Sequence, residues 1–185
     1  MNSYFQEAAG VLEKMAENSP GELSLLPEKI FECWRRGGRV LSFGNGGSAA
    51  DSLHFTTELV ARFRSEPIGK PAISLNTNQC SITAIANDWD FTEVFSRQVA
   101  AQATGEDVLI GISTSGNSEN VIRGLEKGIR KGCECFGLTG QTGGRMADLD
   151  INLITVPSRR TAHIQQAHAA CLHWVCDQID RQLNG

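Results

Sequence analysis

The sequence predicts an α/β fold built on a parallel sheet, and three observations support this prediction. Five short apolar runs recur along the chain, near residues 39–43, 71–75, 107–112, 133–138 and 151–156. Stretches with helical spacing separate these runs, which is typical of parallel strands joined by helical crossovers. With 185 residues and 41% hydrophobic content, the chain can bury a full core as one domain, so we expect residues 1–185 to form a single unit.

Two helices are expected before the first strand. Apolar side chains recur at helical spacing over residues 4–15, and Pro20-Gly21 breaks this pattern. A second helix is predicted from about Pro27 to Arg36, where Gly37-Gly38 ends it. Residues 160–183 are predicted to form one long closing helix. The predicted organisation therefore has N-terminal helices over 1–37, and the α/β core with its closing helix over 38–185.

Two of the expected strands lead into turns rich in glycine or hydroxyl groups. Residues 44–51 read Gly-Asn-Gly-Gly-Ser-Ala-Ala-Asp, and residues 113–118 read Ser-Thr-Ser-Gly-Asn-Ser. Glycines let a ligand approach the backbone, and helix starts offer free N–H groups with a partial positive charge. Because both turns lie at the carboxyl ends of strands, we expect one anionic ligand between them. Helix capping is the alternative role of the hydroxyl groups, but four of them exceed what one cap needs.

His54 and Glu58 form a candidate metal or substrate pair on the helix after the first turn. A spacing of four residues places both side chains on one helix face, about one turn apart. Taken alone, the pair is more typical of a hydrogen-bonded interior histidine and a surface carboxylate. Its position just beyond a turn that suits an anion favours the functional interpretation.

The closing helix carries the other three histidines of the chain, at positions 163, 168 and 173, together with Gln165. We expect His163 and His168 to be structural or solvent-facing. On a regular helix, Gln165 and His173 are separated by about 12 Å along the axis. If both residues serve one site, either Gln165 lies in a frayed or bent first turn, or the ligands come from different subunits.

Charge and composition exclude several classes of protein. The formal net charge is −4 and no basic run exceeds a few residues, so no nucleic-acid footprint is present. The sequence contains no secretory signal and no apolar run of membrane length. The six cysteines include no Cys-x-x-Cys pair. We therefore expect a cytoplasmic protein with reduced thiols and no membrane or nucleic-acid partner.

Several motifs occur in a fixed order between residues 5 and 182. They are Gly44-Asn-Gly-Gly-Ser48, Asp51-Ser-Leu-His-Phe55 with Glu58, Ala86-Asn-Asp88, Gly111-Ile-Ser-Thr-Ser-Gly-Asn-Ser118, Leu138-Thr-Gly140 with Gly143-Gly144, and Ile164-Gln-x-x-His168 with His173. In this order they resemble the phosphoheptose isomerases, which belong to the sugar isomerase (SIS) superfamily. The resemblance implies a five-stranded parallel sheet flanked by helices in the three-layer, flavodoxin- or Rossmann-like SIS fold. It also implies a homotetramer with active sites at subunit interfaces, in which the N-terminal helices pack.

The resemblance further implies a reaction, a cofactor and a set of site residues. The reaction is the conversion of sedoheptulose 7-phosphate to D-glycero-D-manno-heptose 7-phosphate, and the cofactor is one Zn²⁺ per subunit. The implied zinc ligands are His54, Glu58, Gln165 and His173. The assigned substrate-binding residues are Asn45, Gly46, Gly47, Ser48, Glu58, Asn87, Asp88, Ser113, Thr114, Ser115, Ser118 and Gln165.

The chemistry of a ketose–aldose isomerisation assigns roles to two of these residues. A base removes a proton from C1, and an acid returns one at C2 through an enediol. Glu58 is the best candidate for the base and His173 for the acid, with zinc polarising the C1 and C2 oxygens. A carboxylate that ligates zinc is a weaker base. Either Glu58 leaves the metal during turnover, or it is only a ligand and another group takes the proton.

One departure from the family and three alternatives bear on the function. Residues 157–163 contain no acidic residue and instead carry Arg159 and Arg160, so another sugar phosphate is a candidate substrate. Residues 44–49 match the dinucleotide fingerprint, but no acid follows the next strand, which argues against a nicotinamide enzyme. No Gly-Lys-Ser or Gly-Lys-Thr supports a P-loop. A noncatalytic SIS protein that binds the bacterial replication initiator is the stronger alternative, because it shares segments resembling residues 83–88 and 157–162 but lacks the full metal set.

Overall fold

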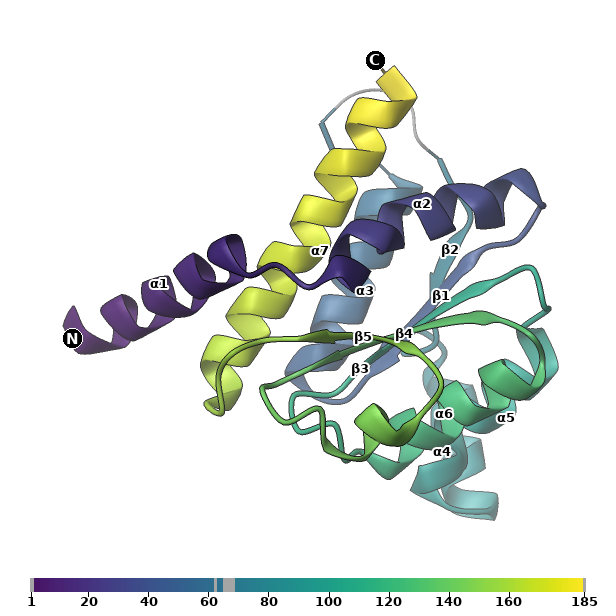
Figure 1. The fold of residues 1–185 in the computed structure, drawn as a ribbon. Coiled ribbons are helices and arrows are strands. Elements are labelled where there is room, and N and C mark those ends of the chain that lie inside the picture. Colours follow the sequence, from purple (N-terminus) through teal and green to yellow (C-terminus); the bar gives the residue numbers. More distant parts are fainter. Residues whose placement is uncertain (1, 62, 65–68, 185) are drawn as a thin grey trace.

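Five parallel strands form the sheet in the computed structural model, which describes residues 2–61, 63–64 and 69–184 (Figure 1). They are paired in the order β2-β1-β3-β4-β5, and every neighbouring pair is parallel. The expected five-stranded parallel sheet is thus confirmed. The strands are β1 (Val40–Gly44), β2 (Ala72–Ser74), β3 (Val108–Ile112), β4 (Glu134–Thr139) and β5 (Asn152–Thr155).

Helices cover both faces of the sheet because the strand residues are apolar on both sides. On β3, Val108, Ile110 and Ile112 join the core beneath α2 (Gly21–Arg35), α3 (Gly47–Val60) and α7 (Thr161–Asn184). Leu109 joins the core beneath α4 (Gln79–Asp88), α5 (Val94–Gln102) and α6 (Glu119–Arg130). Two short 3₁₀ helices, η1 (Phe91–Glu93) and η2 (Gly144–Asp148), complete the second layer.

The second helix begins earlier than predicted. The expected start was Pro27, whereas α2 runs from Gly21 and contains Pro27 in its interior. Proline removes one helical hydrogen bond and disfavours this position. Leu23 and Leu26, both in the part of the helix before Pro27, are buried against the core, where burial of each contributes about 1.5–3 kcal/mol. Tertiary packing therefore outweighs the local preference against proline.

The first polar turn is also shorter than predicted. Residues 44–51 were expected to form the turn, but β1 ends at Gly44 and α3 begins at Gly47. Gly46 has a φ of 55°, a backbone conformation that residues other than glycine rarely adopt. This conformation permits the abrupt change of direction. Residues 47–51 consequently form the first turn of α3 rather than a loop.

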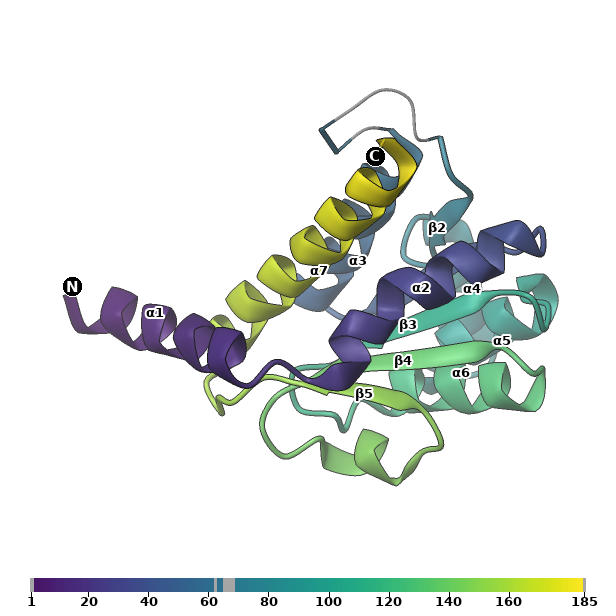
Figure 2. The same ribbon diagram turned by 45° about the horizontal axis from the view of Figure 1, so that its top comes forward.

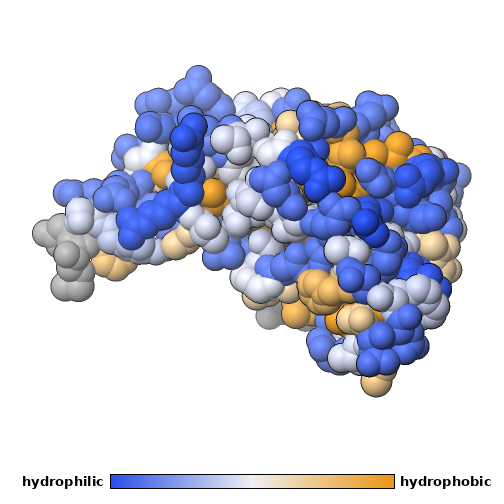
Figure 3. All heavy atoms as spheres, turned by 90° about the horizontal axis from the view of Figure 1, so that it is seen from below, coloured by the Kyte–Doolittle hydropathy of each residue, from blue (hydrophilic) through white to orange (hydrophobic). Residues whose placement is uncertain are grey.

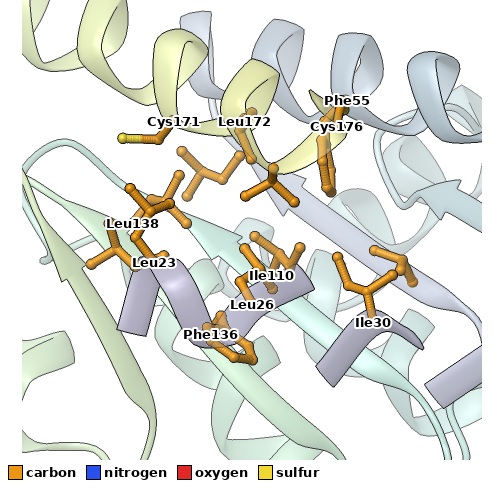
Figure 4. Packing of buried hydrophobic residues seen from close by; sticks show 14 of the residues in the cluster. Leu23, Leu26, Ile30, Phe55, Ile110, Phe136, Leu138, Cys171, Leu172 and Cys176 are labelled. Atoms are coloured by element: carbon orange, nitrogen blue, oxygen red, sulfur yellow. The ribbon is translucent and has the colours of Figure 1, made fainter. Parts of the chain in front are cut away.

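Helices α3 and α7 lie side by side above the sheet, as Figures 1 and 2 both show. Figure 4 shows how they share one core: Phe55 from α3 and Leu172 and Cys176 from α7 project toward Ile110 and Leu26. A chain of buried hydroxyl groups also fixes α3 to the sheet. The Oγ of Ser52 lies 2.7 Å from the Oγ atoms of Ser42 and Ser74, on β1 and β2.

The first helix, α1 (Asn2–Glu17), extends away from the sheet and contacts α7 (Figures 1 and 2). Phe5 and Leu12 are 64% and 42% exposed on it. Viewed from below in Figure 3, apolar side chains alternate with hydrophilic ones along this extension and gather in patches on the body. None of the helices in the described part of the chain is long and apolar enough to cross a membrane. All six cysteines are free thiols.

Candidate functional site

His54, Glu58 and His173 form a compact cluster between α3 and α7. One potential ligand atom from each lies within 4.8 Å of the others. His54 Nε2 is 3.0 Å from Glu58 Oε1 and 3.4 Å from His173 Nε2. The sequence predicted the first pair from helical spacing, and the packing of α7 on α3 adds His173 from far along the chain. Two imidazole nitrogens and one carboxylate oxygen are a donor set that zinc accepts, with a position left open for water or substrate.

A small space next to the cluster is lined by both helices, including Asp51, Ala169 and Cys176. Burial raises the pKa of the Asp51 carboxyl to about 6, against a smaller opposing effect of His54. Asp51 Oδ2 has no hydrogen-bond partner in the described part of the chain. Asp51 was not among the predicted site residues. Its position three residues before His54 places it on the same face of the helix and could have indicated its proximity to the cluster.

The short turn after β1 exposes backbone donors at the start of α3. The helix begins at a glycine cap, with no side chain to accept a hydrogen bond. Among the described residues, the N–H groups of Gly46 and Gly47 have no acceptor, and both residues are exposed. Ser48, in contrast, is only 3% exposed in the first turn of the helix. The turn therefore offers N–H groups at the positive end of a helix, as an anion or an electronegative ligand requires.

A second donor group follows β3. Ser113 Oγ lies 2.9 Å from Ser118 Oγ and 3.5 Å from Ser115 Oγ. Ser118 is the cap residue of α6, yet its side chain makes no capping hydrogen bond. Ser115 Oγ accepts from Asn117 N, so one hydroxyl group does stabilise the turn. The convergence of three hydroxyl groups favours the ligand-binding interpretation over capping.

The glycine motif at 143–144 has a packing role beside this hydroxyl group cluster. Gly116 has a φ of 68°, and a Cβ there would lie 1.9 Å from the carbonyl oxygen of Gly143. A Cβ at Gly144 would lie 2.3 Å from the carbonyl oxygen of Ser115. Only glycines permit this close approach of the two turns.

Gln165 lies at the start of α3 rather than beside the cluster of His54, Glu58 and His173. It is the fifth residue of a continuous helix, so the frayed start considered from the sequence is not seen. A Cβ on Gly47 would lie 2.3 Å from Gln165 Nε2, which places the amide against the start of α3. Gln165 does not line the space next to His54 and His173. Within one subunit, the structure brings together three of the four expected metal ligands.

His163 and His168 are structural, as the sequence analysis expected of them. His163 is 3% exposed and lies 3.4 Å from Glu7 and against the ring of Tyr4, which connects α7 to α1. His168 is fully buried and its Nε2 lies 3.1 Å from the carbonyl oxygen of Thr139. Burial lowers the pKa of His168 to about 4, so its imidazole is neutral at pH 7.

Asn87 and Asp88 lie at the end of α4 with exposed side chains, and Asn87 Nδ2 donates to Asp88 Oδ1. Within the described ranges, neither side chain forms a hydrogen bond with the other candidate residues. The two arginines of the 157–163 segment differ in their surroundings. Arg160 pairs with Glu7 at 2.7 Å and lies over the ring of Tyr4, whereas Arg159 is exposed. Arg160 thus connects the segment before α7 to α1, although it is exposed like Arg159.

Comparisons with known proteins show the family of the chain. A family model described as SIS domain matches residues 3–140. The phosphoheptose isomerase of Syntrophotalea carbinolica is 43% identical over 184 residues, covering 99% of this chain and 93% of that protein. That of Trichlorobacter lovleyi is 45% identical over 181 residues, covering 97% and 92%.

Solved structures give the same result. The phosphoheptose isomerase from Neisseria gonorrhoeae superposes with a TM-score of 0.90 at 36% identity, covering 96% of both chains. A phosphoheptose isomerase from Francisella tularensis gives a TM-score of 0.92 at 34% identity, covering 97% of this chain and 96% of the other. The chain therefore belongs to the SIS-domain family and, within it, to the phosphoheptose isomerases.

Proposed function

We propose that this protein converts sedoheptulose 7-phosphate into D-glycero-D-manno-heptose 7-phosphate through an enediol. The observation that carries the proposal is the His54–Glu58–His173 cluster in a chain of this family, on the helix whose start carries the exposed N–H groups. The noncatalytic alternative is disfavoured because the acid, the base and the metal donors are all present.

The donor set of the cluster fits a divalent metal, and we propose Zn²⁺, one per subunit. His54, Glu58 and His173 would hold it, and the ion would supply Lewis acidity toward the oxygens at C1 and C2. Gln165 is the proposed fourth ligand. Gln165 does not lie beside the cluster of its own subunit, so only a site shared between subunits would take this ligand from a neighbouring copy.

The protein's own groups then move the protons. Glu58, 20% exposed at its side chain, is the proposed base for the C1 proton, and His173 is the proposed acid at C2. Because both residues would also hold the metal, these roles require each of them to leave it during turnover. Glu58 Oε1 faces His54, which leaves Oε2 as the basic atom. The His54 Nε2 contact fixes the carboxylate orientation, so the base is in place before substrate arrives.

We assign substrate binding to the turns that follow β1 and β3, which are neighbouring strands. Hydroxyl groups and helix-start amides can hold a phosphate without lysine or arginine, and the serine cluster after β3 provides this arrangement. The turn after β1 would bind the sugar chain. The proposed substrate residues are Asn45, Gly46, Gly47, Ser48, Glu58, Asn87, Asp88, Ser113, Thr114, Ser115, Ser118 and Gln165.

We propose a cytoplasmic homotetramer in which α1 packs against other subunits. Phe5, Leu12 and Trp174 are exposed apolar side chains on α1 and α7. Leu12 and Trp174 also line a groove that continues to Met15 between the helices. Exposed apolar surface of this kind is typical of protein interfaces. Sedimentation of an active monomer would remove this part of the proposal.

Metal analysis and an isomerisation assay test the proposed reaction together. The purified protein should contain about one zinc ion per subunit and interconvert the two heptose phosphates. Glu58→Gln should lower kcat by roughly 10² to 10⁴-fold, since it removes the base. Glu126→Gln, on the opposite face of the sheet, is the matched control and should be unchanged. Ser118→Ala should act mainly on KM. A zinc-loaded wild type without activity on either sugar would reject the proposed substrate.

A further inference from the structure

The residues Gly44, Asn45 and Gly46, here called the β1 turn, are held by two asparagines that have no place in the proposed site. Asn76 follows β2 and forms hydrogen bonds with the backbone of Gly44 on one side. Gly44 N donates to Asn76 Oδ1 at 3.2 Å, and Asn76 Nδ2 donates to the carbonyl oxygen of Gly44 at 2.9 Å. The side-chain amide thus continues the β1–β2 pairing beyond the last residue of β2.

Asn120 holds the turn from the other side. Asn45 Nδ2 donates to Asn120 Oδ1 at 2.8 Å, and Asn120 Nδ2 donates back to Asn45 Oδ1 at 2.9 Å. Asn120 is 3% exposed, lies in the first turn of α6, and also accepts from Val121 N. Its orientation is therefore fixed by its own helix. The amide pair links the turn after β1 to the helix after β3, at the carboxyl ends of two neighbouring strands.

This pairing limits what Asn45 can offer a ligand. Its Oδ1 and one hydrogen of its Nδ2 are already used, so most of its side-chain capacity is directed at Asn120. The N–H groups of Gly46 and Gly47, in contrast, are exposed and without an acceptor among the described residues. A glycine turn is flexible by itself, and ordering it upon binding would weaken affinity.

We propose that Asn120 and Asn76 are positioning residues that fix the β1 turn, so that the N–H groups of Gly46 and Gly47 face the sugar phosphate. Asn120 acts through Asn45, and Asn76 acts through the backbone of Gly44. The proposal rests on the proposed function for the identity of the ligand. The arrangement of the turn itself does not depend on it. A turn that is ordered before binding holds its donors in place for substrate and transition state alike. Loss of this order should therefore raise KM more than it lowers kcat.

A double-mutant cycle tests whether Asn120 acts through Asn45. Asn120→Ala should raise KM about 10-fold with kcat changed less than about 3-fold. In an Asn45→Ala background, the same substitution should raise KM by less than about 2-fold, because the partner is already absent. Asn152→Ala is the control, since it removes an asparagine that pairs with Glu134 at the opposite edge of the sheet. A full additional 10-fold loss in the double variant would overturn the proposal.

Hydrogen exchange of the ligand-free protein provides a readout that needs no substrate. The amides of Ser48, Ala49 and Ala50 are bonded to the carbonyl groups of Asn45 and Gly46. Their protection should fall in Asn120→Ala and in Asn76→Ala but not in Asn152→Ala. Unchanged protection in both variants would overturn the proposal, and Asn76→Ala alone decides if Asn120→Ala does not fold. Lost protection in a protein without isomerase activity would support the positioning role while rejecting the proposed reaction.

Discussion

His168→Gln should make the stability of the protein less sensitive to acid. The His168 imidazole is fully buried, donates through Nε2 to the carbonyl oxygen of Thr139, and has no partner for Nδ1 in the described part of the chain. Burial lowers its pKa from 6.5 to about 4. Glutamine keeps an N–H donor at this position and has no titrating group.

The sign and size of the effect follow from proton linkage. The folded state disfavours the charged imidazole. The stability of the fold is therefore unaffected by this group above about pH 6.5, and it decreases as the pH falls from 6.5 toward 4. Over that interval the unfolded chain binds the additional proton, and unfolding free energy falls by up to about 1.4 kcal/mol per pH unit. The difference between 6.5 and about 4 corresponds to about 3 kcal/mol in total.

Urea unfolding between pH 4 and 8 measures this quantity. Both proteins should be prepared with chelator, because metal binding has its own pH dependence. The unfolding free energy of the wild type relative to His168→Gln should fall by about 3 kcal/mol between pH 7 and pH 4. Other titrating groups, such as Asp51, are present in both proteins and cancel in the difference. Parallel pH profiles would show that the burial of His168 does not control acid stability.

Three further substitutions test how the structure places the site. Gly47→Ala should leave thermal stability within a few degrees of wild type but lower activity, because the new methyl group displaces the flexible end of Gln165, only 2.3 Å away; unchanged activity would show that Gln165 is not needed there. Gly116→Ala should destabilise by more than about 2 kcal/mol in urea unfolding, since its Cβ meets the Gly143 backbone at a positive φ. Ser52→Ala should reduce unfolding free energy by about 1–3 kcal/mol with kcat nearly unchanged, because it breaks the buried hydroxyl chain beneath α3.

The sheet was predictable because its signal is local. Each buried strand is a short apolar run, and the alternation of such runs with helical stretches leaves few arrangements other than a parallel sheet. The start of α2 was not predictable in the same way. Pro20 and Pro27 both suggest a helix start, and only the burial of Leu23 and Leu26 selects the earlier one. The choice is made by contacts that a single sequence does not display.

In the candidate site, too, the features that depend on local spacing were predictable and those that depend on distant contacts were not. Helical spacing alone predicts that His54 and Glu58 share a face, and the structure places them 3.0 Å apart. The Asn45–Asn120 and Gly44–Asn76 contacts join residues 75 and 32 positions apart. An asparagine after a strand is typical of a turn, so its local pattern gives no sign of a distant partner. Positioning residues are therefore harder to predict from sequence than the groups they position.

The packing of α3 and α7 explains why Gln165 and His173 occupy different ends of the site. Gln165 lies against Gly47 at the start of α3, and His173 lies against His54 further along it. The axial distance from Gly47 to His54 on α3 is about 10 Å, and that from Gln165 to His173 on α7 is about 12 Å, so the two pairs are similarly spaced. Ala169 lies midway between Gln165 and His173, and its small side chain lines the space beside the cluster. A ligand that contacts both the N–H groups of the β1 turn and the His54 cluster must therefore extend along α3, which favours a sugar with a long carbon chain over a triose.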